Sequence, residues 1–355
     1  MRRRDLLHAS GAAALAGLAG CAGLLETRSG GEPPLVDPRP DAVYVPTHVE
    51  GMAMAGMQSD GGYRCALTYT YPHRFWTVTG QRRERIEVES DDSVHLMPVV
   101  WHAETGVVPP DRSIDLTVTQ GGEAVTPPLS PWSMLSQPMG FHFGDNVALD
   151  GDGTYRVEVG VGAPSTRRTG ALADAAGQLS FSFDLEFEQS ALEEVMYRDI
   201  PDDEEGTAGA VDPMDGMDAL PSTQAPAEAD LPGTVRGKGT SGDARFVVAT
   251  VADATPFGGG EDETYLAVSP RTPYNRYVLP AMSLSATLGR GTETVFDGDL
   301  RATIDPALGY HYGAAVSGVE SGDDLTVTVD APPQVARHEG YETAFLSMDD
   351  VSVAL

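Results

Sequence analysis

Side chains that can bind transition metals are concentrated in the first half of the chain. His95 and His102 bracket a β-rich run that also contains Met97, and a strand would place His95 and Met97 on one face. Met134 lies shortly before His142, which has a phenylalanine on each side. Imidazole suits iron, copper and zinc, whereas a thioether selects for soft Cu(I). These residues are candidates for a metal site, although an aromatic-flanked histidine in a β-sandwich is more often a core or interface residue.

A second group of methionines lies earlier in the chain. Met52, Met54 and Met57 follow His48 in a loop rich in glycine and alanine. A flexible loop of this kind can fold over a metal that imidazoles already hold. The alternative is that these methionines pack apolar surface, which is their usual role.

The chain lacks the common catalytic and zinc-binding motifs. It has no Cys-x-x-Cys or His-Glu-x-x-His pattern, so a zinc finger or zinc enzyme has no support. Nucleophile elbows and phosphate loops are also absent. Asp145, Asp150 and Asp152 resemble a calcium loop only loosely, because the later bidentate glutamate is missing. We therefore expect a binding protein and not an enzyme.

One pattern occurs twice in the chain. The sequence Phe-His-Phe-Gly at 141–144 recurs as Tyr-His-Tyr-Gly at 310–313. Each copy leads into an alternating, strand-like run, at 155–161 and at 325–329, and then into a proline turn. Internal repetition of this kind indicates two tandem copies of one domain. It places His311 at the position of His142.

Short β-rich runs separated by turns make up most of the chain. The clearest is 179–188, which is apolar at every second position and is typical of a strand with one buried face. This spacing predicts an all-β protein with two tandem Ig-like β-sandwich domains, at 43–198 and 242–355. The acidic segment 199–241 has little to bury and is predicted to be a disordered linker.

The N-terminus has the features of an export signal. Three arginines precede a short apolar run, and the order Arg-Arg-x-Leu-Leu suits the twin-arginine route. The Leu-Ala-Gly before Cys21 resembles the lipobox of exported lipoproteins, whose cysteine becomes lipidated. We expect a signal at 1–21, a flexible tether at 22–42 and anchoring to the outer face of the cell membrane. Cleavage elsewhere, or an uncleaved anchor, is the alternative.

The chain is strongly acidic. It has 53 aspartates and glutamates against 23 lysines and arginines, for a formal net charge of −30. Lys238 is its only lysine. An acidic surface with arginine in place of lysine suits a high-salt habitat, and we expect a halophilic, archaeal source. A GC-rich genome would explain the scarcity of lysine but not the acid excess. The charge argues firmly against nucleic acid as a partner and is compatible with cations.

The motifs of the first copy resemble those of the periplasmic iron-transport proteins that accompany a high-affinity iron permease. The resemblance rests on His95-Leu and His102-Ala, on a methionine shortly before Gly-Phe-His142-Phe-Gly, and on the Gly-x-Tyr-x-Val strand that follows. It covers about 43–190, and the second copy weakly. It implies an Ig-like fold, dimerisation, and binding of copper and iron through His and Met. By position, His95, Met134 and His142 match ligands of that family.

The chain departs from the family pattern in an informative way. Met97 stands where the family has a glutamate, and this exchange favours Cu(I) over hard ions. The family's final loop histidine is missing from the first copy, while the second keeps it as His338. The second copy lacks the strand histidine and has Tyr277 or Val278 there. We predict that the main ligands are His95, Met97, Met134 and His142, with His102, Met52, Met54, Met57, His311 and His338 as secondary candidates.

The resemblance favours a lipid-anchored, extracytoplasmic protein that captures iron or copper for a membrane permease. It also implies a dimer or an intramolecular pseudo-dimer of the two domains, in which His311 and His338 could complete a shared site. The alternative is a cell-surface structural or adhesion lipoprotein that binds no metal. An electron-transfer copper protein is disfavoured, because Cys65 has no cluster of Cys, His and Met around it.

Overall fold

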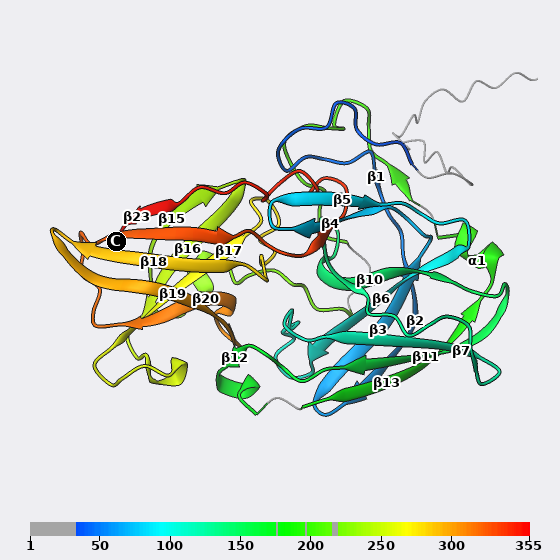
Figure 1. Ribbon diagram of the computed structural model, residues 1–355, viewed down its shortest axis with the longest axis horizontal. Helices are drawn as coiled ribbons and strands as arrows, with labels where there is room; N and C mark the ends of the chain where they lie inside the picture. The colour runs from blue at the N-terminus through cyan, green and yellow to red at the C-terminus, as the bar shows by residue number, and fades with distance from the viewer. Residues whose placement is uncertain (1–32, 175–176, 196, 215–218) are drawn as a thin grey trace, which may run out of the picture.

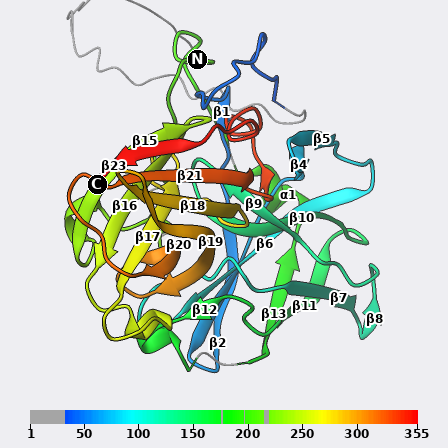
Figure 2. The same cartoon turned by 60° about the vertical axis from the view of Figure 1, so that its left-hand side comes forward.

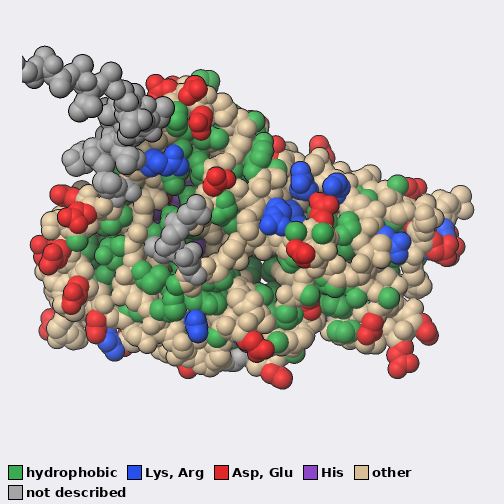
Figure 3. Space-filling model, turned by 180° about the vertical axis from the view of Figure 1, so that it is seen from behind, with side chains coloured by type: hydrophobic (Ala, Val, Ile, Leu, Met, Phe, Trp, Pro, Cys, Tyr) green, Lys and Arg blue, Asp and Glu red, His purple; other side chains and the backbone are tan. Residues whose placement is uncertain are grey.

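The structure is a computed structural model that describes residues 33–174, 177–195, 197–214 and 219–355. Cys21 and the predicted signal lie outside the described residues. The predicted all-β class is confirmed, since strands form two halves that lie side by side (Figure 1). Acidic side chains are spread over both halves, and little histidine is visible on the face shown in Figure 3. No helix among the described residues is long and apolar enough to cross a membrane.

The first half is built from two sheets. The main sheet contains, in spatial order, β2 (Ala53–Asp60), β3 (Tyr63–Thr70), β6 (Asp92–His102), β10 (Gly140–Ala148), β9 (Trp132–Ser136), β22 (Ala336–Arg337), β4 (Phe75–Thr79) and β5 (Arg82–Ile86). The second sheet contains β13 (Leu179–Phe187), β11 (Gly153–Val161), β7 (Ile114–Gln120) and β8 (Glu123–Ala124). Both sheets contribute to one apolar core that includes Leu96, Val157 and Phe183.

The second half repeats this arrangement. Its strands, in spatial order, are β15 (Thr234–Ser241), β16 (Ala244–Val251), β17 (Thr264–Arg271), β20 (Gly309–Val316), β19 (Glu293–Asp305), β18 (Ser283–Arg290), β21 (Asp324–Ala331) and β23 (Val351–Ala354). β19 is long enough to pair with β20 at its end and with β18 at its start.

Short elements complete the fold: β1 (His48–Val49) pairs with β14 (Arg198–Asp199), and the helices are α1 (Gln189–Glu193) and the 3-10 turns η1 (Gly170–Leu172), η2 (Glu228–Asp230) and η3 (Thr255–Phe257).

The repeated motif occupies the same place in both halves. The order β2-β3-β6-β10-β9 corresponds to β15-β16-β17-β20-β19, and β13-β11-β7 corresponds to β23-β21-β18. Nδ1 of His142 lies 3.1 Å from the carbonyl oxygen of Gly140, and Nδ1 of His311 lies 3.0 Å from that of Gly309. Both glycines have a positive φ, 70° and 68°, that favours glycine at the hairpin turn. The histidines are therefore equivalent, as the repeat predicts.

Each half also donates one short strand to the other. β12 (Arg167–Arg168) of the first half pairs in parallel with β19 of the second, and Figure 2 shows the two side by side. β22 of the second half pairs in parallel with β9, so that Ala336 lies opposite Met134, and it also pairs with β4. This exchange fixes the loop that follows β22 against the first half, and that loop begins with His338.

The segment 199–241 is not a disordered linker over its described residues. The N–H of Val211 donates to the side-chain oxygen of Gln137 over 2.8 Å, and the N–H of Phe141 donates to Oγ1 of Thr223 over 2.9 Å. Residues 234–241 form β15 and belong to the second half. The prediction is wrong here because hydrogen bonds to both halves order a segment that has few apolar side chains.

The predicted flexible tether, 22–42, is likewise wrong for its described residues, 33–42. The carbonyl oxygen of Pro33 accepts a hydrogen bond from Arg74 over 2.6 Å, and the N–H of Val36 donates to Glu339 over 3.1 Å. Arg74 is close to Glu339 as well, with 3.6 Å between Nη2 and Oε2. The backbone groups of Pro33 and Val36 are thus held by charged side chains that lie far away in the sequence.

Candidate metal centre

Four buried histidines meet where the two halves join. His73 comes from the loop between β3 and β4, His95 from β6, His142 from β10, and His338 from the residue after β22. They are between 0% and 7% exposed. The ring centroids of His73 and His95 are 4.1 Å apart, those of His73 and His338 4.9 Å, and those of His142 and His338 5.2 Å. One of the four therefore comes from the second half of the chain.

Three of these rings are held by a hydrogen bond at Nδ1. Nδ1 of His95 lies 2.8 Å from Oδ1 of Asn146, and Nδ1 of His73 lies 3.1 Å from the carbonyl oxygen of Tyr71. Nδ1 of His142 faces the carbonyl oxygen of Gly140 in the same way. Since these oxygens only accept hydrogen bonds, each Nδ1 carries the proton and each Nε2 has a free lone pair. This is the second-sphere arrangement that orients a metal-binding imidazole.

The four Nε2 atoms have no hydrogen-bond partner within the described part of the chain. Those of His73, His95, His142 and His338 are all buried. A buried polar atom without a partner costs about 1–3 kcal/mol, so most such atoms are paired in native proteins. Four of them in one cluster point to a ligand that accepts their lone pairs, which is what a metal ion does.

Met134 reaches the same point from β9. It is fully buried and lies directly opposite His142 in the strand register. A Cβ on Gly144 would collide with Nε2 of His95 and would lie 3.1 Å from the sulfur of Met134. The thioether and the imidazole therefore share the space above Gly144. The structure thus brings together three of the four main predicted ligands, His95, Met134 and His142.

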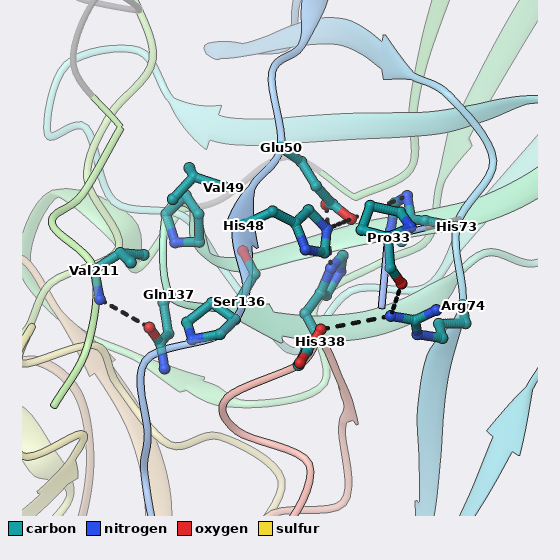
Figure 4. Close-up of a pocket in the computed structure, with 13 residues that line it drawn as sticks. Pro33, His48, Val49, Glu50, His73, Arg74, Ser136, Gln137, Val211 and His338 are labelled. Carbon is teal, nitrogen blue, oxygen red and sulfur yellow. Dashed lines mark hydrogen bonds and ion pairs between the residues drawn. The ribbon is translucent and has the colours of Figure 1, made fainter. Parts of the chain in front are cut away.

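Glu50 adds a carboxylate next to the histidines (Figure 4). Its oxygens lie 3.7 Å from Nε2 of His48, 3.8 Å from Nδ1 of His73 and 3.7 Å from Nδ1 of His338. Burial alone would raise the pKa of Glu50, but His73, His338 and His48 together hold it well below its usual value. The carboxylate is therefore ionised and gives the cluster a negative charge. One ligand atom each of Glu50, His73 and His338 lie within 4.8 Å of one another.

Met97 lies beside this cluster rather than within it. It lines a cavity of about 20 Å³ together with Met52, Met139 and Met214, and Glu50 and His338 border the same cavity. The predicted methionine loop is wrong for Met54 and Met57, because both lie on β2. Of the three early methionines, Met52 alone reaches this place. Met54 is exposed, and Met57 packs against a separate apolar cluster around Trp101.

His102 lies away from the centre. It is the last residue of β6, its Nδ1 is 3.1 Å from Oγ1 of Thr105, and its ring packs edge-on against Tyr63 at 5.2 Å. The sequence did not single out Glu50 or His73 as ligands. Both lie in connections between strands and belong to no repeat or spacing pattern. A single His and a single Glu in such connections do not indicate a metal site by themselves.

The equivalent place in the second half holds a hydrogen-bonded network. Ala315 corresponds to Asn146, because each follows the repeated histidine by the same number of residues on its strand. Tyr265 pairs with Ala315 as His95 pairs with Asn146, so Tyr265 stands at the position of His95. The prediction of Tyr277 or Val278 at this position is therefore wrong. The hydroxyl of Tyr265 lies 3.0 Å from Nε2 of His311, which gives that atom the partner that Nε2 of His142 lacks.

The remaining ligand positions of the second half are also replaced. By strand register, Thr303 takes the place of Met134, and Thr169, which follows β12, takes the place of His338. The hydroxyl of Thr169 donates to Asp305. His311 is thus the single ligand-type side chain retained, and it is used for packing and hydrogen bonding.

Comparison with known proteins supports a metal-binding assignment for the first half. Residues 79–189 match the family model described as Fe2+ transport protein. This segment is similar to that family. The match confirms the predicted resemblance over these residues, and the predicted copper or iron ion agrees with it. The segment contains His95, Met134 and His142, whereas Glu50, His73 and His338 lie outside it. Residues 229–354 match a second model, a domain of unknown function, DUF7350.

Solved structures of low similarity were also found. FetP of uropathogenic E. coli strain F11 is 18% identical, with 39% of this chain and 96% of that chain covered and a TM-score of 0.30. A copper-bound variant of P19 from Campylobacter jejuni is 15% identical, with 39% and 98% covered and a TM-score of 0.31. No match was found among curated proteins.

Burial keeps the cluster in the form that binds metal. It lowers the pKa of His73 to about 4 and that of His142 to about 3, and the pKa of His95 also falls well below 6.5. Neighbouring imidazoles add to the effect, because a second positive charge close by is unfavourable. His73 and His142 are therefore neutral in the absence of metal at any pH above about 4.

We expect copper affinity to stay level as the pH is lowered from 7 to 5 and to fall as the pH approaches 4. Protons compete with a metal only below the pKa of the free ligand, and here the pKa values of His73 and His142 are about 4 and about 3. Copper titrations at fixed intervals of pH, with folding followed by circular dichroism, measure this. A loss of affinity centred near 6.5 would contradict the buried, neutral cluster.

We also expect Gly144→Ala to weaken metal binding at least tenfold while leaving the fold intact. The new Cβ would push Nε2 of His95 away from the sulfur of Met134. Gly177→Ala is the matched control, because Gly177 is exposed and a Cβ there meets nothing within 4 Å. Equal copper affinity in Gly144→Ala and the wild type would show that the ion lies elsewhere.

Proposed function

We propose that this protein captures a copper or iron ion outside the cytoplasm and passes it to a membrane permease. The observation that carries the proposal is a cluster of four buried histidines whose Nε2 atoms have no partner among the described residues, with the sulfur of Met134 beside Nε2 of His95. All five are lone-pair donors, so the occupant they favour is a cation. The ion is cargo rather than a resident cofactor.

The donor set favours copper and is compatible with iron. Imidazole suits both metals, and the thioether of Met134 favours Cu(I). Met97 replaces the glutamate expected after the strand histidine, but Glu50, in the connection between β1 and β2, supplies a carboxylate at 3.8 Å or less from His73 and His338. The site therefore combines soft and hard donors.

Both halves are needed for the complete centre. His338 follows β22, whose pairing with β9 holds it against the first half. The first half without the second would lack this imidazole. We propose that the chain works as an intramolecular pseudo-dimer with one His and Met centre, and that it acts as a binding protein and not as an enzyme.

Anchoring by a lipid on Cys21 fits this function. Pro33, the first described residue, lines the same cavity as His48, Glu50, His73 and His338. A tether that leaves the fold at this place would keep the cavity close to the membrane and to a permease.

The alternative function, a structural or adhesion protein without metal, would leave four buried imidazole lone pairs without a partner.

We expect one copper ion per chain at the histidine centre, and we expect His142→Ala and His338→Ala each to lower the affinity at least tenfold. Each variant removes one of the converging Nε2 atoms. His102→Ala is the matched control, since its ring lies outside the cluster. Isothermal titration with copper, with circular dichroism to check folding, measures the effect. Absence of saturable binding in the folded wild type would overturn the proposed function.

Cys21→Ala is expected to release the protein from the membrane into the medium. Stable anchoring normally takes two lipid chains, which a diacylglycerol-modified cysteine supplies, and the described residues contain no helix that could span a bilayer. Fractionation of cells that express each form measures the effect. Retention of the variant in the membrane fraction would rule out a lipid on Cys21 as the anchor.

A further inference from the structure

We infer that Cu(I) enters and leaves the centre along a path of four methionines, Met52, Met214, Met139 and Met97, which connects a surface cleft with His338. The inference rests on the proposed function, because it supplies a route and an oxidation state for the ion of the same centre. The four thioethers act while the ion passes and are not ligands of the bound ion.

The path begins in a surface cleft outside the centre. The cleft has a volume of about 660 Å³, and Met52 and Met214 belong to its wall. Glu204 and Asp212 add carboxylates, and Arg198 is the one basic residue among the described residues that line it. A cleft with an excess of carboxylates raises the local concentration of cations.

The cleft adjoins the cavity of about 20 Å³ beside the centre, because Met52 and Met214 border both spaces. Met97 and His338 border the cavity but not the cleft. Met52 and Met214 are half-buried, whereas Met97 is 2% exposed. A water molecule needs about 10–15 Å³, so the cavity admits one small ion at a time. Thioethers therefore line the way from solvent to an imidazole of the centre.

Four separate segments of the chain bring the methionines together. Met97 lies on β6, Met139 between β9 and β10, and Met52 between β1 and β2. The N–H of Met214 donates to the carbonyl oxygen of Pro138 over 2.9 Å, which holds Met214 beside the residue that follows Pro138. The tertiary fold thus gathers side chains of one kind around one small space.

The composition of the cavity distinguishes it from ordinary apolar packing. Methionines commonly fill irregular gaps in hydrophobic cores. This cavity, however, is also lined by Glu50, Thr70, Ser136 and His338. Polar groups beside thioethers suit a space that a cation crosses.

The chemistry of the thioether explains the selectivity of such a path. Its sulfur is a soft, uncharged donor that favours Cu(I) over hard ions. Rapid passage requires contacts that are favourable enough for entry and weak enough for release. Several thioethers in succession meet both conditions, and the imidazoles at the end of the path then hold the ion.

The double variant Met52→Leu/Met214→Leu tests the path, because leucine keeps a similar volume and removes the sulfur. The full chain is loaded with one equivalent of Cu(I) without oxygen and is mixed with excess bathocuproine disulfonate, a chelator too large for a cavity of about 20 Å³. The absorbance of the coloured Cu(I) complex follows release. We expect release at least fivefold slower than from the wild type. Loading should slow by a similar factor, so the affinity should change less than threefold.

Met54→Leu is the matched control, because Met54 is 37% exposed and lines neither the cleft nor the cavity. It should release Cu(I) at the wild-type rate. Circular dichroism checks folding, and the two single variants replace the double variant if that one does not fold.

Release from the leucine variants that is as fast as from the wild type, or faster, would overturn the path and leave the proposed function intact. A loss of affinity of tenfold or more would also overturn it, because the methionines would then be ligands of the bound ion. Absence of saturable copper binding in the folded wild type would overturn the proposed function and the path together.

Discussion

The metal centre depends on one constraint, the pairing of a two-residue strand with an edge that belongs to the other half of the chain. β22 is held between β9 and β4, and the N–H of His338 donates to the carbonyl oxygen of Leu135 over 3.1 Å. These bonds place an imidazole from near the C-terminus beside His73 and His142. Without them the cluster would contain only the three imidazoles of the first half, and the side that His338 covers would be open.

Much of the fold could be predicted from the sequence, because period-two alternation and the repeated His motif are local signals. His95, Met134 and His142 were found in the same way, each on a strand whose neighbours have a recognisable pattern. Glu50 and His73 lie in connections, where the chain path is set by tertiary contacts. The order of 199–214 was missed for a related reason, since Gln137 and other distant groups supply the hydrogen bonds of that segment.

The two halves fill the same buried position in different ways. In the first half, the Nε2 atoms have no partner among the described residues, which is unfavourable unless an ion binds. In the second half, Tyr265 and Thr303 provide hydroxyls, and His311 is satisfied by Tyr265. Phe257 stacks on Tyr265 at 3.8 Å and closes the space. The same backbone thus supports a binding site in one copy and a packed core in the other.

The exchanged strands tie the second half to the centre of the first, although the described residues of the second half form no such centre. Arg337 of β22 is fully buried and donates to the carbonyl oxygens of Pro333 and Ala344, while Arg168 of β12 pairs with Asp111 in a buried ion pair of 2.6 Å. These buried contacts hold each exchanged segment to its own half, and the pairing of β22 with β9 and of β12 with β19 then joins the two halves. Joining both copies in one chain lets their ligand residues diverge independently, because a substitution in one copy is no longer imposed on both sites of a symmetric pair. In this chain one half accordingly carries Glu50, His48 and His73, while the other holds His338 in place through β22.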